Sequence, residues 1–244
     1  RDLVVASSRR AREVDGVSFD VHSGEILGIA GVEGNGQTEL IEAIAGLRPV
    51  TSGQITLGGV DLIAHTVRER ADHGLSHIPE DRHRRGLILE YTIADNLILG
   101  QQHEYSKRGM LDRRVIAVNA SARIRDFDIR PPNAELPART LSGGNQQKIV
   151  IAREMARAFS VLLAAQPTRG VDVGAIEFIH AELIAAREAG KAVLLVSADL
   201  MEVLALADRV AVMYGGRIVA VVPRGEATGE RLGPYMTGAQ TGAA

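Results

Sequence analysis

The stretch Glu25–Leu40, EILGIAGVEGNGQTEL, decides the fold that the sequence predicts. Its first six residues, Glu25–Ala30, form a short apolar run that is typical of a buried strand. A glycine-rich turn, Gly31–Gly36, comes next, and Thr38–Ala45 then shows a helical pattern that stops at Gly46. A strand, a glycine-rich turn and a helix in this order are the context that a phosphate-binding loop requires.

The chemistry of this loop comes mainly from its backbone. Glycines let the chain wrap a phosphate, and the start of a helix offers free N–H groups and the positive end of a dipole. The residues predicted to bind nucleotide are Gly31, Glu33, Gly34, Asn35, Gly36, Gln37 and Thr38. Thr38 would place a hydroxyl on Mg²⁺, whereas Gln37 stands where such loops carry lysine and cannot supply a positive charge. On this stretch alone, a plain glycine-rich turn remains an alternative.

Strands and helices alternate along the rest of the chain. Further strands are predicted at Ile55–Leu57, Ser76–Ile78, Val161–Ala165, Ala192–Ser197, Val210–Tyr214 and Arg217–Val222. Helices are predicted over about Thr92–Arg130, Asn145–Ala158, Ala175–Glu188 and Asp199–Ala207, and Pro131-Pro132 ends the first stretch. A charged loop is predicted at Glu80–Gly86, a hairpin turn at Gly215-Gly216, and a partly mobile tail from Arg224. The alternation argues an α/β core with a mainly parallel sheet and a separate helical lobe in the middle.

Composition excludes several classes of protein. The 244 residues carry a net charge of -2, so they show no basic footprint for nucleic acid. The absence of cysteine excludes disulfides and thiolate metal sites. Apolar runs such as Ala192–Val196 are too short to span a bilayer, so any membrane contact is expected to run through a partner. The chain begins at Arg1 rather than methionine, and we expect it to be part of a longer polypeptide.

A second motif narrows the interpretation. It consists of Leu141, Ser142, Gly143, Gly144, Asn145 and Gln146, followed by Gln147-Lys148, and reads LSGGNQQK. Ser142 after a loop is a good helix N-cap, which is the structural alternative for this motif. At this spacing after a phosphate-type loop, LSGGNQQK resembles the signature loop of ABC transporter ATPases. In that family the loop contacts the γ-phosphate of ATP held by the opposite subunit.

The resemblance covers about 17–222 and implies an α/β P-loop ABC ATPase fold. Its parts would be a mainly parallel, RecA-like core sheet, an antiparallel β subdomain and an inserted α-helical subdomain. The whole chain, 1–244, would be one ATP-binding domain, with core and β lobe at about 1–90 and 159–223, a helical lobe at about 91–158 and a tail at 224–244. The implied ligands are ATP and Mg²⁺.

Several positions depart from the family pattern. Where the family has Asp-Glu-Pro-Thr after a strand, this chain has Ala165-Gln166-Pro167-Thr168, so the residues of the Mg²⁺ shell and of the general base are missing. Ala198 stands where the family has a histidine that contacts the γ-phosphate. Glu80 stands where the family has a glutamine that meets the metal and the attacking water, so the resemblance makes Glu80 a further nucleotide-binding residue. The family also has an aromatic residue upstream of the phosphate loop that stacks on the adenine. Phe19 is the only aromatic residue before Gly24, and we interpret it as a core residue. Asp172 in Gly170-Val171-Asp172 matches the loop that contacts the opposite subunit, and it is also a candidate helix cap.

The four segments GVEGNGQTEL, IPEDRHRRGL, LSGGNQQK and AAQPTRGVDVGA are similar to the second ATPase domain of tandem importers for simple sugars and nucleosides. The resemblance implies that this domain serves its partner's ATP site while its own site is inactive and binds nucleotide weakly. The implied partners are an intact ABC ATPase domain in the first half of the polypeptide, membrane permease subunits and, indirectly, a substrate-binding protein, at the cytoplasmic side of the membrane. In importers the Glu80–Arg85 loop and the helices from Thr92 lie against the permease, although a solvated loop is the alternative.

Two other functions stay open at this stage. One is a scaffold or regulatory domain that binds no nucleotide. The other is a soluble ABC protein of translation or repair.

Overall fold

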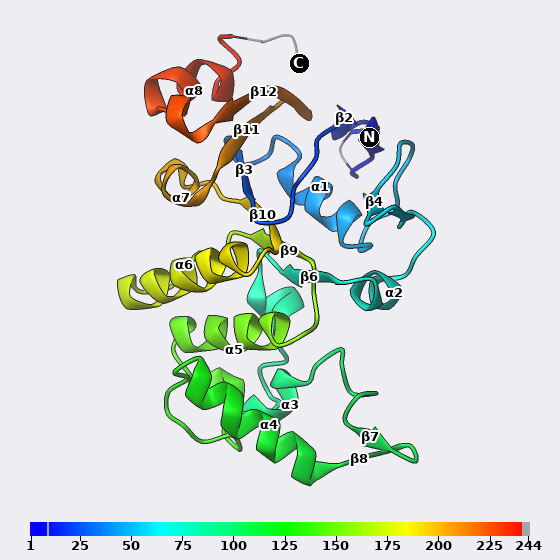
Figure 1. Ribbon diagram of the computed structural model, residues 1–244, viewed down its shortest axis with the longest axis vertical. Helices are drawn as coiled ribbons and strands as arrows, with labels where there is room; N and C mark the ends of the chain where they lie inside the picture. The colour runs from blue at the N-terminus through cyan, green and yellow to red at the C-terminus, as the bar shows by residue number, and fades with distance from the viewer. Residues whose placement is uncertain (9, 241–244) are drawn as a thin grey trace. The chain divides into compact units, whose positions relative to one another are not determined.

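A computed structural model describes residues 1–8 and 10–240 (Figure 1). The chain forms two compact units. The first contains Arg1–His77, Phe159–Gln166 and Leu183–Ala244, and the second contains Ile78–Ala158 and Pro167–Glu182. Part of the predicted tail, 241–244, lies outside the described residues.

The first unit is built on a six-stranded sheet with the order β12-β11-β3-β10-β9-β6. The strands are β3 (Ile26–Ala30), β6 (Leu75–Ile78), β9 (Val161–Ala165), β10 (Ala192–Val196), β11 (Arg209–Tyr214) and β12 (Arg217–Pro223). The pairs β11–β3, β3–β10 and β10–β9 are parallel, and β12 closes the edge as an antiparallel hairpin with β11. The predicted α/β fold with a mainly parallel sheet is therefore confirmed, including the hairpin at Gly215-Gly216.

Two small antiparallel sheets and a set of helices complete this unit. The sheets pair β1 (Leu3–Val5) with β2 (Val14–Val17) and β4 (Thr56–Leu57) with β5 (Val60–Asp61). The helices are α1 (Gln37–Ile44), α2 (Val67–Asp72), α7 (Leu200–Leu206), the 3₁₀ turn η3 (Arg224–Glu226) and α8 (Gly229–Met236). The predicted tail is thus folded as η3 and α8 up to Met236, because Leu232 is fully buried and gives the segment an apolar anchor.

Strands β3, β9 and β10 share an apolar core with β1, β2 and α1. Leu27, Leu163 and Leu194 lie on these three strands, Leu40 comes from α1, and all four are buried. Phe19 packs against this cluster, which agrees with its interpretation as a core residue. Since parallel strands end at one edge of a sheet, the loops after β3, β9 and β10 meet there, and these are the loops that carry the predicted phosphate chemistry.

The second unit is mostly helical. Its elements are the π-helical turn η1 (Arg82–Gly86), α3 (Ile93–Leu97), β7 (Ser106–Lys107), β8 (Met110–Leu111), α4 (Arg113–Asp126), the 3₁₀ turn η2 (Ala138–Thr140) and α5 (Gly143–Met155). The long helix α6 (Val173–Glu188) belongs to this unit as far as Glu182. Buried Arg153 on α5 donates to the carbonyl oxygens of Gly86 at 2.7 Å and Asn96 at 3.3 Å, which ties α5 to η1 and α3.

Two predictions for this unit were incomplete. The helical stretch Thr92–Arg130 is interrupted by the β7–β8 hairpin, whose turn residues Arg108 and Gly109 both have positive φ. The predicted charged loop contains η1, because the Asp81 carboxylate accepts from the N–H groups of His83 at 2.9 Å and Arg84 at 3.0 Å.

Candidate functional site

The glycine-rich loop joins the carboxyl end of β3 to the first turn of α1. Gly36 is the N-cap residue of α1 and has a φ of 99°. A Cβ atom on Gly36 would stand 2.6 Å from the carbonyl oxygen of Glu13, and one on Gly31 would collide with that of Met213. The loop therefore needs glycine at both positions, and it presents main-chain N–H groups at the positive end of a helix.

The side chain of Gln37 turns back into this loop. Its Oε1 accepts from the N–H of Asn35 at 3.1 Å, and its Nε2 donates to the carbonyl oxygen of Val32 at 3.1 Å. Only 8% of the residue is exposed. Asn35 is fixed as well, since its Oδ1 accepts from the N–H of Gly215 at 2.8 Å. A neutral amide oxygen thus takes one of the N–H donors that the loop would otherwise offer to a phosphate.

Three other predicted residues of the loop are exposed. Glu33 and Gly34 lie on the loop, and Gly34 has a φ of 90°. Thr38 lies in the first turn of α1, on the surface. All three residues therefore lie at the solvent-exposed side of the loop and of the start of α1.

The two positions that should carry hydrolysis chemistry are joined to each other. Gln166 follows β9 in a left-handed conformation with a φ of 46°. Its N–H donates to the carbonyl oxygen of Val196 at 2.7 Å, and its Oε1 accepts from the N–H of Ala198 at 3.1 Å. The carboxamide therefore bridges the ends of β9 and β10, but it cannot accept a proton as a carboxylate base does.

The signature motif starts α5 in the second unit. Ser142 is the N-cap residue, and its Oγ accepts from the N–H of Asn145 at 3.4 Å and from Asn145 Nδ2 at 3.0 Å. Leu141 is buried. Gln146 is held by His83, whose Nε2 lies 2.7 Å from Gln146 Oε1, and donates its own amide to the carbonyl oxygen of Leu141. Ser142 therefore caps α5, and this capping role is compatible with the interpretation of the motif as a signature loop.

The loop Pro167–Asp172 lies directly against this helix start. Asp172 caps α6 through its Oδ1, which accepts from the N–H of Ala175 at 3.0 Å. A Cβ atom on Gly144 would stand 2.7 Å from Asp172 Oδ2. The Glu80 carboxylate makes an ion pair of 2.7 Å with Arg169. The structure therefore brings Glu80, the signature motif and Asp172 together in one unit.

Two residues of this cluster, Arg82 and Arg169, were not predicted as site residues. Burial lowers the pKa of the Arg82 guanidinium below its ordinary value, with the Asp81 carboxylate opposing the shift. An arginine stays charged under such a shift because its unperturbed pKa is far above neutrality. The charge of the predicted Glu80–Gly86 loop was a signal for Arg82, and no charge pattern marked Arg169.

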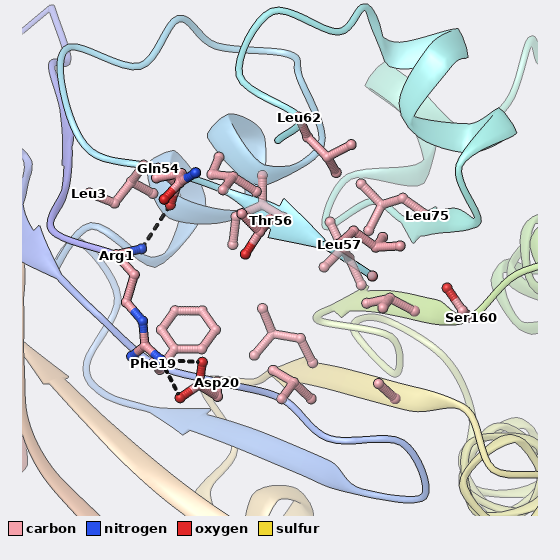
Figure 2. A pocket seen from close by; sticks show the side chains of 18 of the residues that line it. Arg1, Leu3, Phe19, Asp20, Gln54, Thr56, Leu57, Leu62, Leu75 and Ser160 are labelled. Atoms are coloured by element: carbon pink, nitrogen blue, oxygen red, sulfur yellow. Dashed lines mark hydrogen bonds and ion pairs between the residues drawn. The ribbon is translucent and has the colours of Figure 1, made fainter. Parts of the chain in front are cut away.

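An apolar cavity of about 320 Å³ lies elsewhere in the first unit (Figure 2). Figure 2 shows Leu3, Phe19, Leu57 and Leu75 around it, with the Arg1–Asp20 ion pair at its side. It reaches the sheet at Val161 and Ala192, the first residues of β9 and β10. The phosphate-type loop follows the carboxyl end of β3, which runs parallel to β10, so it lies at the opposite edge of the sheet and the cavity is not part of the anion site.

Comparison with known proteins decides the family. The ABC transporter family profile matches residues 14–169 of the chain. The chain belongs to the ABC transporter family. Solved ATP-binding cassettes of this family share its fold: a nucleotide-free cassette aligns with a TM-score of 0.78 at 22% identity, over 91% of this chain and 89% of its own. A second cassette aligns with a TM-score of 0.80 at 20% identity, over 97% and 95%. The P-loop ABC ATPase fold is thereby confirmed.

Curated members of the ABC family are more similar in sequence. The guanosine import ATP-binding protein NupO of Bacillus subtilis (strain 168) is 48% identical over 97% of this chain and 47% of its own length. The nucleoside import ATP-binding protein NupA of Lactococcus lactis subsp. cremoris is 46% identical over 98% and 47%. A ribose import ATP-binding protein of Yersinia pestis is 39% identical over 93% and 45%. The chain spans about half the length of these relatives.

Membership implies ATP binding, and the phosphate loop fits part of an ATP molecule. The backbone of Gly34–Gln37 and the start of α1 suit a polyphosphate. The Gln37 amide competes for the Asn35 N–H and brings no charge. The loop can therefore cradle phosphate with fewer donors than its geometry allows.

The described residues fit Mg²⁺ less well than they fit phosphate. Thr38 offers a hydroxyl, but β9 ends in Ala165, whose side chain has no ligand atom. No cluster of three or more His, Asp or Glu side chains in the described part of the chain is arranged to hold a metal. Mg²⁺ prefers oxygen ligands and usually combines one or two carboxylates with phosphates and water. At this loop it would depend on Thr38, phosphate and water.

Among the described helices, none is both long enough and apolar enough to cross a lipid bilayer.

Proposed function

We propose that this chain is the second ATP-binding domain of an ABC importer for nucleosides or simple sugars. In this role it supplies its signature loop to the partner domain's ATP while its own site is defective in hydrolysis. The relatives are named for guanosine, nucleoside and ribose import, which supports the substrate class. The chain corresponds to less than half of each relative, which leaves room for a first ATP-binding domain on the same polypeptide.

The observation that carries the proposal is the contrast between the two half-sites. The Gln37 amide oxygen accepts a hydrogen bond from the Asn35 N–H inside the phosphate loop, and the Gln166 amide oxygen accepts one from the Ala198 N–H. The signature loop, by contrast, begins α5 with Ser142 in the N-cap position. Loss of a general base typically costs about 10²–10⁴-fold in rate. A domain with this pair of half-sites is useful only beside a partner with an intact phosphate loop, Mg²⁺-binding Asp and catalytic Glu.

The proposal includes a set of partners and a location. They are an intact ABC ATPase domain in the first half of the polypeptide, integral membrane permease subunits and, indirectly, a substrate-binding protein. The protein would lie on the cytoplasmic side of the membrane as a peripheral subunit. Within 1–244 we retain one ATP-binding domain, with ATP and Mg²⁺ bound weakly at its own loop.

The test compares Ser142→Arg with Thr38→Ala in the complete transporter, by substrate-stimulated ATP hydrolysis. Ser142→Arg should abolish hydrolysis, by about 10²–10³-fold or more, because it removes a hydroxyl aimed at the partner's γ-phosphate and blocks its approach. Thr38→Ala should be mild, because Thr38 belongs to the site that already lacks its base.

A control separates phosphate contact from helix capping. Ser142→Asp keeps a good N-cap for α5 but places a negative charge against the γ-phosphate, so it should also be inactive. An inactive Thr38→Ala beside an active Ser142→Arg would reverse the assignment and place the working site on this chain.

A scaffold that binds no nucleotide is the second candidate, and the Gln37–Asn35 hydrogen bond favours it. Calorimetry with ATP or ADP at millimolar concentration separates the two functions. Heat of binding, or a rise in melting temperature with nucleotide, supports the importer domain. The absence of both supports the scaffold.

A further inference from the structure

Arg82 joins two loops that are far apart in sequence. Its guanidinium donates from Nη1 to the carbonyl oxygen of Arg169 at 2.8 Å and from Nη2 to that of Gly170 at 3.2 Å. These two carbonyls are consecutive, so one planar side chain binds both at once. The first residue of η1 is thereby attached to the loop Pro167–Asp172.

The same guanidinium lies over the signature motif. A Cβ atom on Gly143 would stand 2.8 Å from Arg82 Nη2 and 2.9 Å from the carbonyl oxygen of Gly170. Because Gly143 has no side chain, there is room beside it for the hydrogen bond between the Arg82 guanidinium and the Gly170 carbonyl group. Arg82 contacts both the signature loop and Pro167–Asp172.

Other contacts in the unit hold the same two loops. Gln147 on α5 donates to the carbonyl oxygen of Pro167 at 2.8 Å. Glu80, two residues before Arg82, forms the ion pair with Arg169. The loop is thus fixed at its start by α5 and along its middle by the Glu80–Arg82 segment.

We propose that Arg82 is a positioning residue that holds Pro167–Asp172 against the signature loop, so that both reach the partner domain's ATP site in a fixed relation. This inference rests on the proposed function. Lysine would not replace Arg82, because a single ammonium is a point charge and lacks the planar fork that binds two carbonyls. Arg82 acts through its contacts with Gly143 and with the carbonyl groups of Arg169 and Gly170.

The experiment measures kcat and KM for ATP of the reconstituted transporter carrying Arg82→Ala or Arg82→Lys. A displacement of about 1 Å at a distant supporting residue can cost about 10²-fold in rate, so we expect kcat to fall by about 10- to 100-fold in both variants. KM should change far less, because the phosphate loop that binds this ATP lies on the partner. Free guanidinium, below denaturing concentration, should restore part of the kcat of Arg82→Ala.

The controls are chosen within the same chain. Arg217 lies on β12, outside both loops, and binds the Asp15 carboxylate. The variant Arg217→Ala should keep wild-type kcat and show no response to guanidinium. Wild-type kcat in Arg82→Lys, or no recovery of Arg82→Ala with guanidinium, overturns the inference. If Arg82→Ala does not fold, Arg82→Lys decides alone: a lower kcat at nearly constant KM supports the inference, and wild-type kcat overturns it.

Failure of this inference is distinguishable from failure of the proposed function. Ser142→Arg is measured in parallel. If Ser142→Arg is inactive while both Arg82 variants equal wild type, only the positioning role is lost. If Ser142→Arg retains hydrolysis, the signature loop does not serve a partner's ATP and the proposed function fails.

Discussion

At the scale of single residues, Gln37 shows how one neutral substitution acts twice on an anion site. A lysine would extend its charge to the β- and γ-phosphates, and it would leave the loop N–H groups to phosphate oxygens. The glutamine amide instead bonds to Val32 and Asn35 within the loop. On the proposed function, both effects are expected to weaken phosphate binding without disturbing the loop backbone.

Gln37→Lys should therefore tighten Mg-ATP binding. A hydrogen bond to a charged group is worth about 1.5–3 kcal/mol, which corresponds to about 10- to 100-fold in affinity. The measurement is calorimetry on the purified domain, with Gln37→Met as a control that keeps the size of the side chain but adds no charge. Equal affinity of the lysine and methionine variants would show that charge at this position is not what limits binding.

Sequence patterns could predict the missing charge at Gln37 and the missing base at Gln166, because both follow from residue type. They could not predict where the two amides point. The Gln166 bond to Ala198 depends on a left-handed backbone at Gln166 and on the parallel pairing of β9 with β10. Such contacts join segments distant in sequence, which a local motif does not describe.

At the scale of elements, α7 packs on β3 through a gap left by one glycine. A Cβ atom on Gly28 would stand 2.6 Å from Val203 Cγ1 and 2.9 Å from Ala207 Cβ, and both side chains are buried. The close approach of helix and strand fixes the layer behind the phosphate loop.

Gly28→Ala should destabilise the domain by about 1–3 kcal/mol, because the added methyl overpacks this contact. Chemical denaturation measures the change, and Val203→Ala in the same chain should make the double variant less unstable than the sum of the single variants. Gly225→Ala is the matched control, since its Cβ would meet no described atom within 4 Å. Strict additivity of Gly28→Ala and Val203→Ala would contradict the packing argument.

Whether a helix, strand or turn could be predicted from the sequence depends on the residues that form it. Strand β9 was predicted with its observed ends, Val161–Ala165, because a buried parallel strand is a continuous apolar run. The β7–β8 hairpin was missed, because its turn places Arg108 and Gly109 at positive φ without the Asn-Gly or Asp-Gly signal of such turns. η1 was missed because its start depends on the Asp81 cap rather than on apolar spacing.

At the scale of the whole molecule, the two half-sites determine which assemblies are productive. ABC domains pair head to tail, so a symmetric dimer of this chain would be isologous and would repeat one composition at both sites. Each site would combine a sound signature loop with Gln37, Ala165 and Gln166. On the proposed function, a productive site therefore requires a partner whose phosphate loop and general base differ from these.

The isolated domain should therefore be a very poor ATPase at any concentration. Ordinary enzymes turn over at about 10 s⁻¹, and we expect this domain to stay far below about 1 s⁻¹ because a dimer supplies no general base. Phosphate release from Mg-ATP is measured across a range of protein concentrations, with Thr38→Ala as the baseline for contaminating activity. Adding back the base alone, by Gln166→Glu, should give little recovery, since Ala165 still provides no carboxylate for the metal shell and groups that act as a unit do not contribute additively. Turnover of about 1 s⁻¹ or more in the unmodified domain, rising with concentration, would mean that two copies of this chain form a working site.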